Sequence, residues 1–149
     1  MEMTDKNELK ELLSHVRRIC IDMHGVIDSD PTYFKDLMYE LTNMGIDIYV
    51  LSGPPAEEIT KKLSLFDINP LSHFNKVLSI VDYLRSIGEK MWLDNKDTWW
   101  ADEVSWWSAK ANICEKMDID VMIDNTNKYE PYFRHIKARF ILWINTKEI

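Results

Sequence analysis

Residues 19–27 read ICIDMHGVI, an apolar run that ends in Asp22 and is followed by His24 and Gly25. A short continuous run of this kind is typical of a strand that is buried on both faces of a parallel sheet. The carboxylate and the imidazole would then lie at the carboxyl end of that strand, which is where open α/β sheets bind ligands. The stretch therefore predicts a parallel sheet with a chemical site at one edge.

Helix-like and strand-like segments alternate along the rest of the chain. Helical spacing and helix-start signals predict helices over residues 5–17, 31–44, 54–66, 78–84, 102–117 and, short and broken, 129–136. Apolar, β-branched runs predict strands over residues 18–22, 46–52, 90–93, 120–124 and 139–145. This alternation predicts an α/β fold with a doubly wound, Rossmann-like parallel sheet in three layers, α/β/α.

The composition is that of an ordinary globular protein. The chain has 149 residues, of which 46% are hydrophobic and 29% charged, so we expect a single domain over residues 1–149. The formal net charge of -7 argues against extended binding to nucleic acid or to an anionic membrane. The apolar runs are too short to span a bilayer, and the charged residues 1–12 do not resemble a secretory signal.

Two cysteines, Cys20 and Cys114, both fall in apolar-periodic stretches. We interpret them as reduced core residues, which favours a cytoplasmic protein. The histidines at positions 15, 73 and 135 have no spacing that suggests a shared ligand. We expect them to be surface or structural residues.

Polar residues of complementary chemistry follow three of the predicted strands. These are Asp22 with His24, Ser52 with Gly53, and Asp124 with Asn125, while Lys110 lies on the helix before the Asp124 strand. Carboxylates, a hydroxyl, a backbone amide and a lysine at one sheet edge are the groups needed to hold a phosphate and a hard divalent cation. Taken alone, each of them is also a common turn or capping residue.

The four segments together resemble the motifs of the haloacid dehalogenase-like (HAD) superfamily of phosphohydrolases. IDMHGV matches its Asp-x-Asp-Gly-Thr/Val motif, IYVLSG its strand ending in Ser or Thr, and VMIDN its acidic strand end. Lys110 is the most suitable lysine, with Lys90 and Lys96 as alternatives in the same interval. The resemblance runs from residue 18 to about residue 145 and implies a HAD-like fold.

The resemblance also implies roles. Asp22 would be the nucleophile that forms an aspartyl-phosphate, and Ser52, Gly53 and Lys110 would hold the transferred phosphoryl group. The carboxylates of Asp22 and Asp124, with the backbone carbonyl of His24, would bind Mg²⁺. The implied reaction is magnesium-dependent hydrolysis of a small phosphomonoester.

Two positions depart from the family pattern. His24 stands where phosphatases of the superfamily usually have a second Asp, the acid/base that protonates the leaving oxygen. Histidine can do this because its ordinary pKa lies near neutrality. Two other interpretations remain open, a substrate contact and impaired turnover. Asn125 stands where many relatives are acidic, and we expect it to support the site without adding charge.

Tryptophans cluster in MWLDNKDTWWADEVSWW, residues 91–107. Core packing is the ordinary explanation, but adjacent Trp pairs cannot all point inward, and exposed aromatic residues often bind ligands. We expect a small insert around residues 88–107 in place of a cap domain. Trp99, Trp100, Trp106 and Trp107 would then select the substrate, and stacking on them suits a flat group such as a nucleobase. A nucleotide is the first candidate, a sugar or other small phosphate the next, and a protein or nucleic-acid end the third.

Two other classes of protein compete with the enzyme. One is a regulatory protein on the same fold, which binds a phosphorylated ligand and turns it over poorly. The other is a receiver-like signalling domain, which is less suitable because its phosphorylated Asp does not normally follow the first strand with x-Gly-Val. A site without a cap domain can also be covered by a neighbouring subunit. The sequence is therefore compatible with a homo-oligomer as well as with a monomer.

Overall fold

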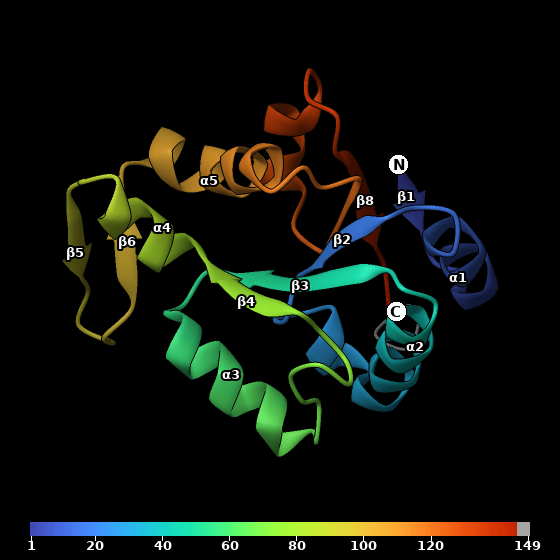
Figure 1. The fold of residues 1–149 in the computed structure, drawn as a ribbon. Coiled ribbons are helices and arrows are strands. Elements are labelled where there is room, and N and C mark those ends of the chain that lie inside the picture. Colours follow the sequence, from blue (N-terminus) through green and yellow to red (C-terminus); the bar gives the residue numbers. More distant parts are fainter. Residues whose placement is uncertain (146–149) are drawn as a thin grey trace.

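The computed structural model describes residues 1–145 and contains a six-stranded sheet in the order β1-β8-β7-β2-β3-β4, with every pairing parallel (Figure 1). Its strands are β1 (Glu2–Met3), β2 (Arg18–Ile21), β3 (Asp47–Ser52), β4 (Lys76–Ser79), β7 (Val121–Asp124) and β8 (Arg139–Trp143). A separate antiparallel hairpin pairs β5 (Met91–Leu93) with β6 (Trp99–Ala101). The predicted α/β fold with a parallel sheet is confirmed.

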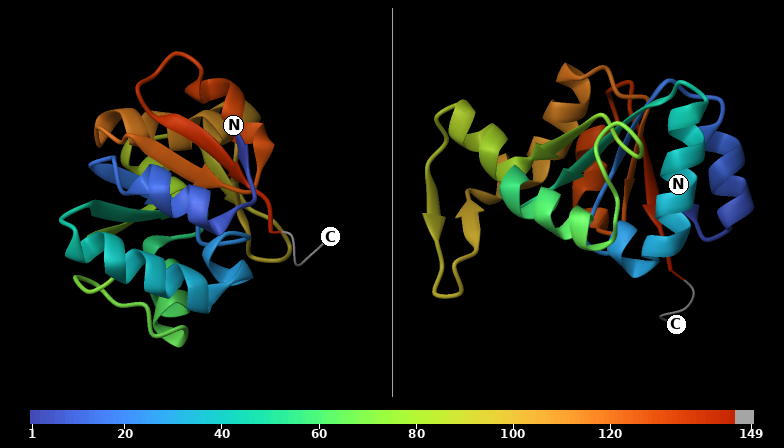
Figure 2. Two further views of the ribbon diagram at one scale, coloured as in Figure 1. Left: turned by 90° about the vertical axis from the view of Figure 1, so that its right-hand side faces the viewer. Right: turned by 60° about the horizontal axis from the view of Figure 1, so that its bottom comes forward.

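Helices cover both faces of this sheet. They are α1 (Lys6–Leu13), α2 (Pro31–Asn43), α3 (Ala56–Leu65), α4 (Ile80–Ser86) and α5 (Glu103–Lys116), with the 3-10 segments η1 (Ile27–Ser29) and η2 (Asn127–Phe133). In Figure 1, α5 lies above the sheet while α2 and α3 lie below it. The two further views in Figure 2 show the same layers from the side and from below.

The strand β2 shows why both faces are covered. Its residues Ile19 and Ile21 pack into the core beneath α1, α2 and α3, whereas Cys20 packs into the core beneath α4, α5 and η2. Successive side chains of a strand point to opposite faces, so an unbroken apolar run requires apolar partners on both sides. Cys20 and Cys114 are buried free thiols of the second core, as expected.

Several elements differ from the sequence-based expectation. The segment 78–84 is not one helix, because β4 continues to Ser79 and pairs with β3 through Leu51↔Leu78 and Ser52↔Ser79. The Ser79 hydroxyl then accepts a hydrogen bond from the Asp82 amide at 3.1 Å, and this cap begins α4. A strand and a helix that follow each other without a loop have no turn signal between them. The two-residue strand β1 and the strand β6 were likewise not predicted.

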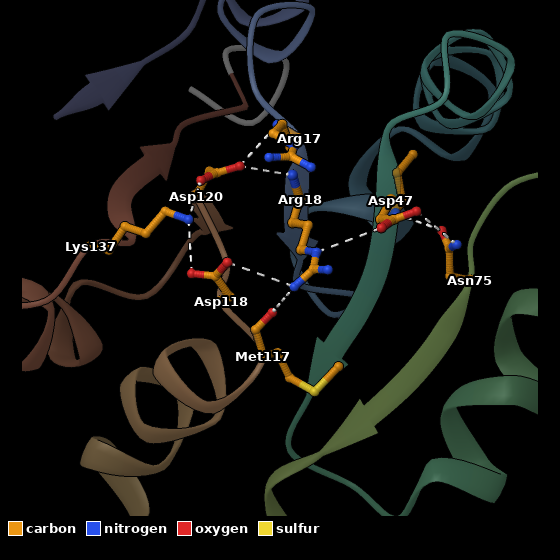
Figure 3. Close-up of polar contacts among 9 residues, drawn as sticks. Arg17, Arg18, Asp47, Asn75, Met117, Asp118, Asp120 and Lys137 are labelled. Atoms are coloured by element: carbon orange, nitrogen blue, oxygen red, sulfur yellow. Dashed lines mark hydrogen bonds and ion pairs between the residues drawn. The ribbon is translucent and has the colours of Figure 1, made fainter.

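The amino edge of the sheet carries a network of ion pairs (Figure 3). Asp120 accepts hydrogen bonds from the backbone amides of Arg17 and Arg18, both at 2.9 Å. Lys137 Nζ lies 2.9 Å from Asp118 Oδ1 and 3.0 Å from Asp120 Oδ1. These contacts join the starts of β2, β7 and β8, so this edge is held together by partly exposed charges.

The chain order places a ligand-binding position at the opposite edge. From β2 the chain crosses to β3 and β4 on one side, and it later returns to β7 and β8 on the other. The carboxyl ends of β2 and β7 therefore flank the point where the winding reverses, the usual ligand position in open α/β sheets. Within residues 1–145, no helix is both long and apolar enough to cross a membrane.

Candidate active site at the carboxyl edge of the sheet

The carboxyl ends of β2 and β7 bring two aspartates next to each other. Asp22 directly follows β2, and Asp124 is the last residue of β7. The backbone amide of Asp22 donates to the Ile123 carbonyl at 2.9 Å, which continues the pairing of the two strands by one step. Both side chains are buried, with Asp124 fully covered and Asp22 5% exposed. Sequence alone placed these residues at strand ends, and the sheet order makes them neighbours.

Lys110 joins the two aspartates. Its Nζ lies 2.5 Å from Asp124 Oδ2 and 3.2 Å from Asp22 Oδ1, and the residue is 1% exposed. Lys110 reaches this place from α5, whose buried face packs on the sheet. The alternatives Lys90 and Lys96 are exposed residues at the β5–β6 hairpin. Of the three lysines considered, the structure brings Lys110 to the site.

Burial controls the protonation of this group of three. It raises the pKa of Asp22 to about 7, an effect that Lys110 opposes and the charge of Asp124 reinforces. Burial by itself would lower the pKa of Lys110, but the charges of Asp22 and Asp124 outweigh it and hold that pKa above its usual value. Two buried carboxylates face one ammonium, so full ionisation leaves one uncompensated negative charge. Such a site has room, electrostatically, for one more positive charge.

Ser52 and Gly53 border the same group from β3. Ser52 is buried, and its hydrogen bonding lowers the pKa of Asp22 against the larger effect of burial. A Cβ added at Gly53 would lie 3.1 Å from a ring carbon of Trp106, which is closer than ordinary van der Waals contact. A side chain at position 53 would therefore fit only if the Trp106 ring moved by a few tenths of an ångström.

Asn125 packs against the loop that follows β2. Its amide has two orientations that occupy the same volume. In one, Nδ2 donates to the His24 carbonyl at 3.1 Å and to Asp22 Oδ2 at 3.3 Å. This orientation satisfies the amide, because its nitrogen then faces two acceptors.

The close approach of Asn125 depends on Gly25. A Cβ at Gly25 would lie 1.9 Å from the Asn125 amide nitrogen, and the φ angle of +84° is one that side chains rarely adopt. Two physical reasons therefore explain the glycine at position 25. It allows the loop after β2 to turn, and it leaves space for the amide that contacts His24 and Asp22.

The imidazole of His24 points away from the buried aspartates. The side chain is 79% exposed, and its Nδ1 lies 3.2 Å from Asp28 Oδ2. The other oxygen of Asp28 accepts the Gly25 amide at 2.7 Å, which ties the carboxylate to the same loop. Asp28 was not singled out from the sequence, although its position four residues after His24 was a usable signal.

The four candidate tryptophans have different surroundings. Trp99 and Trp106 line a cleft of about 160 Å³ that also includes Gly53. Trp100 donates to Asp94 at 2.8 Å and lies outside the residues that line this cleft. Trp107 packs edge-on against Tyr129, with 4.8 Å between the ring centres, and does not line this cleft either. Of the four, Trp99 and Trp106 therefore share one cleft with Gly53, and Trp100 and Trp107 do not line it.

Tyr129 is a further site residue that the sequence did not indicate. Lys110 Nζ lies 4.3 Å from the centre of its ring, a cation–π contact beneath the ammonium. Burial raises the pKa of the Tyr129 hydroxyl, against the opposing effects of Lys110 and of a hydrogen bond from Trp106. Tyr129 thus connects the lysine to the tryptophan of the cleft. Its segment η2 is irregular, so no periodicity marked it.

A metal site built from three acidic, histidine or cysteine side chains is not found in residues 1–145. Asp124 has a partner for each oxygen, Lys110 for Oδ2 and the Thr126 amide for Oδ1 at 3.0 Å. Asp22 Oδ2 and the His24 carbonyl oxygen both lie within reach of the Asn125 side-chain amide, at 3.3 and 3.1 Å. Such a mixed set fits a hard cation that keeps several waters, as Mg²⁺ does.

Comparisons of this chain with protein-family models, with curated proteins and with solved structures gave no match.

Proposed function

We propose that this protein is a magnesium-dependent phosphatase-like hydrolase of small phosphomonoesters and a member of the HAD superfamily. The observation that supports this most strongly is the buried group of Asp22, Lys110 and Asp124 at the point where the sheet reverses its winding. Buried charges destabilise a fold unless they are well paired, so proteins keep them mainly at functional sites. The order of the four motif-like segments agrees with the same family.

The proposed reaction proceeds in two steps. An oxygen of Asp22 attacks the phosphorus in line, and the ester oxygen leaves with a proton from His24. Water then attacks the phosphorus of the aspartyl-phosphate, and neutral His24 takes the proton of that water. Inorganic phosphate is released, and the Asp22 carboxylate and protonated His24 are regenerated.

The remaining residues bind and orient. Lys110, the Ser52 hydroxyl and the Gly53 amide would hold the phosphoryl oxygens, and Lys110 would keep Asp124 in place. Asp22 and the His24 carbonyl, with Asp124 or the Asn125 side-chain oxygen, would hold Mg²⁺. When bound, Mg²⁺ would neutralise the repulsion between the Asp22 carboxylate and the anionic substrate.

The proposal is tested by phosphate release from para-nitrophenyl phosphate, with Mg²⁺ and with EDTA. We expect magnesium-dependent turnover that falls by about 10³-fold or more in Asp22→Asn, which keeps the shape but removes the nucleophile. Asp36→Asn is the matched control, because Asp36 is an exposed residue of α2. Equal turnover by the natural chain and Asp22→Asn would overturn the enzymatic proposal.

A second function is favoured by the exposure of His24. An imidazole that points to solvent suits a protein that binds a phosphorylated ligand and releases it slowly. The two functions differ in their response to the leaving group. An acid at His24 should allow hydrolysis of an alkyl ester such as glycerol phosphate, whereas a binding protein should act only on activated esters.

His24→Asn turns this difference into a prediction. For the enzyme, we expect glycerol phosphate turnover to fall about 10²-fold, because its alkoxide leaves poorly without a proton. Turnover of para-nitrophenyl phosphate should change much less, since its leaving group is stable as an anion. Equal losses on both esters would mean that His24 does not act as the acid.

A further inference from the structure

The cleft that contains Trp99 and Trp106 lies between the β5–β6 hairpin and the start of α3. In the right view of Figure 2 the hairpin stands beside the N-terminal end of α3. One wall comes from Pro54 and Pro55 before α3, and Val81 of α4 also contributes. Residues from four segments distant in sequence therefore enclose one space.

Gly53 connects this cleft to the proposed phosphoryl site. Gly53 lines the cleft and directly follows Ser52, the residue proposed to hold the phosphoryl group. Trp106 packs so closely on Gly53 that a side chain there would meet its ring at 3.1 Å. A substrate with its phosphate at Ser52 would therefore extend its other end toward the Trp106 ring.

The walls of the cleft are flat and held in place. The Trp99 ring packs under the Arg85 guanidinium, with 4.1 Å between that group and the ring centre. Trp106 contacts Trp100 at 5.8 Å between ring centres and hydrogen-bonds Tyr129. Prolines and indoles lose little side-chain freedom on binding, and stacking on an indole suits a planar ring.

The polar residues of the cleft include two carboxylates, which when ionised can only accept hydrogen bonds. Glu58, Asp97 and Thr98 line it together with the apolar walls. Two carboxylates repel a second phosphate and accept hydrogen bonds from N–H groups. The cleft therefore combines flat apolar walls with acceptors, which matches a planar heterocycle that has an amino group on its edge.

We propose that this cleft binds the base of a nucleoside monophosphate, and that it prefers a base with an exocyclic amino group, such as adenine or cytosine. This assignment rests on the proposed phosphatase function, because the phosphate of the same molecule would lie at Ser52 and Lys110. The assignment extends the proposed function by naming the substrate class. Asp97 and Glu58 would accept hydrogen bonds from the amino group.

Binding is measured first with nucleosides, which lack the phosphate. The chain has six tryptophans, so its indole N–H signals in a ¹H–¹⁵N NMR spectrum form a small assignable set. Adenosine should shift the signals of Trp99 and Trp106. The signal of Trp143, which is buried in the other core, should not move. Inosine, in which a carbonyl replaces the amino group, should bind about tenfold more weakly.

Turnover then compares matched substrates, AMP with IMP and CMP with UMP. We expect kcat/KM to favour the amino-bearing member of each pair by about tenfold. Asp97→Asn should bring this ratio toward one. This variant should keep the turn, because Asp97 has a φ of 58°, a conformation that Asn adopts readily. Trp99→Leu should lower kcat/KM for AMP and IMP alike by about tenfold.

Trp92→Leu is the matched control, since Trp92 is 48% exposed on the same hairpin and does not line the cleft. Unmoved Trp99 and Trp106 signals at millimolar adenosine, or equal turnover of AMP and IMP, would overturn the assignment. Faster turnover of phosphocholine, which offers a cation in place of a planar ring, would also overturn it. Failure to hydrolyse para-nitrophenyl phosphate, which has no base, would count against the phosphatase function and not against binding in the cleft.

Discussion

Each edge of the central sheet holds one lysine between two aspartates. At the carboxyl edge, Lys110 Nζ lies 2.5 Å from Asp124 and 3.2 Å from Asp22. At the amino edge, Lys137 Nζ lies 2.9 Å from Asp118 and 3.0 Å from Asp120 (Figure 3). The geometry is similar, but the Lys110 side chain is 2% exposed and the Lys137 side chain 57%.

Solvent exposure determines how each group of one lysine and two aspartates affects stability and carboxylate pKa values. Around Lys137, water screens the charges, and the lysine lowers the pKa of Asp118, as is usual for a paired carboxylate. Around Lys110, burial dominates and raises the pKa of Asp22 in spite of the nearby ammonium. We infer that the amino edge stabilises the fold modestly, whereas the carboxyl edge costs stability and keeps a reactive carboxylate.

The same substitution at both lysines gives the largest expected contrast. Lys110→Met leaves Asp22 and Asp124 facing each other without a counter-charge, so we expect a loss of about 3–5 kcal/mol in the free energy of unfolding. Turnover should be lost as well. Lys137→Met removes a screened pair and should change stability little, with an effect that disappears at high salt.

Urea unfolding of both variants at low and high salt makes this measurement. Equal losses of stability in the two variants would contradict this interpretation, because burial would then have no influence on how much each lysine contributes to stability. A stable Lys110→Met variant would mean that the two aspartates of the carboxyl edge are neutralised without the lysine.

The next largest effect that we predict is a gain in stability for the variant Asp22→Asn. Since burial raises the pKa of Asp22 to about 7 from its ordinary 3.8, folding disfavours its charged form. The resulting cost is absent below the ordinary value, grows as pH rises, and is complete above about 7. Asp22→Asn removes this cost together with the attraction to Lys110, so at pH 8 in EDTA we expect it to be about 2 kcal/mol more stable than the natural chain.

Unfolding of Asp22→Asn and of the natural chain at pH 8 and pH 4 tests the sign of this difference in stability. The difference should shrink at pH 4, where Asp22 is largely protonated in the folded state. Saturating Mg²⁺ at pH 8 should stabilise the natural chain more than the variant, if Asp22 holds the cation. An Asp22→Asn variant that is less stable than the natural chain at pH 8 would contradict the cost assigned to this carboxylate.

Periodicity was sufficient for the strands that form the centre of the sheet. β2, β3 and β7 are largely apolar runs, and a residue that the sequence marked as a site candidate ends β3 and β7 and directly follows β2. The alternation with helices predicts that these strands are parallel, whereas their order in the sheet comes from the structure. Asp22, Lys110 and Asp124 could therefore be named together before any coordinates, although the distances among them could not.

The residues that were missed act through tertiary contacts. Asp28 contacts His24 through a tight 3-10 turn, and Tyr129 reaches Lys110 from the irregular segment η2. Tyr129 has no period or motif that separates it from an ordinary loop residue, whereas Asp28 has only its position four residues after His24. The same holds for the amino edge, where Lys137 follows a loop and meets Asp118 only because β7 and β8 are neighbours.

The smallest effect that we predict belongs to Asp120 at the amino edge. Its partial burial would raise its pKa, but hydrogen bonds from Lys137 and from the amides of Arg17 and Arg18 hold the pKa below its ordinary value. A lowered pKa stabilises the fold above the ordinary value, and this stability is lost as pH falls through the folded value. Asp120→Asn should therefore cost about 1 kcal/mol at pH 7 and much less near pH 3, without changing turnover. Unfolding curves at the two pH values measure this, with the more exposed Asp118→Asn as the control. A variant whose turnover falls would show that the amino edge also shapes the site at the opposite end of β2 and β7.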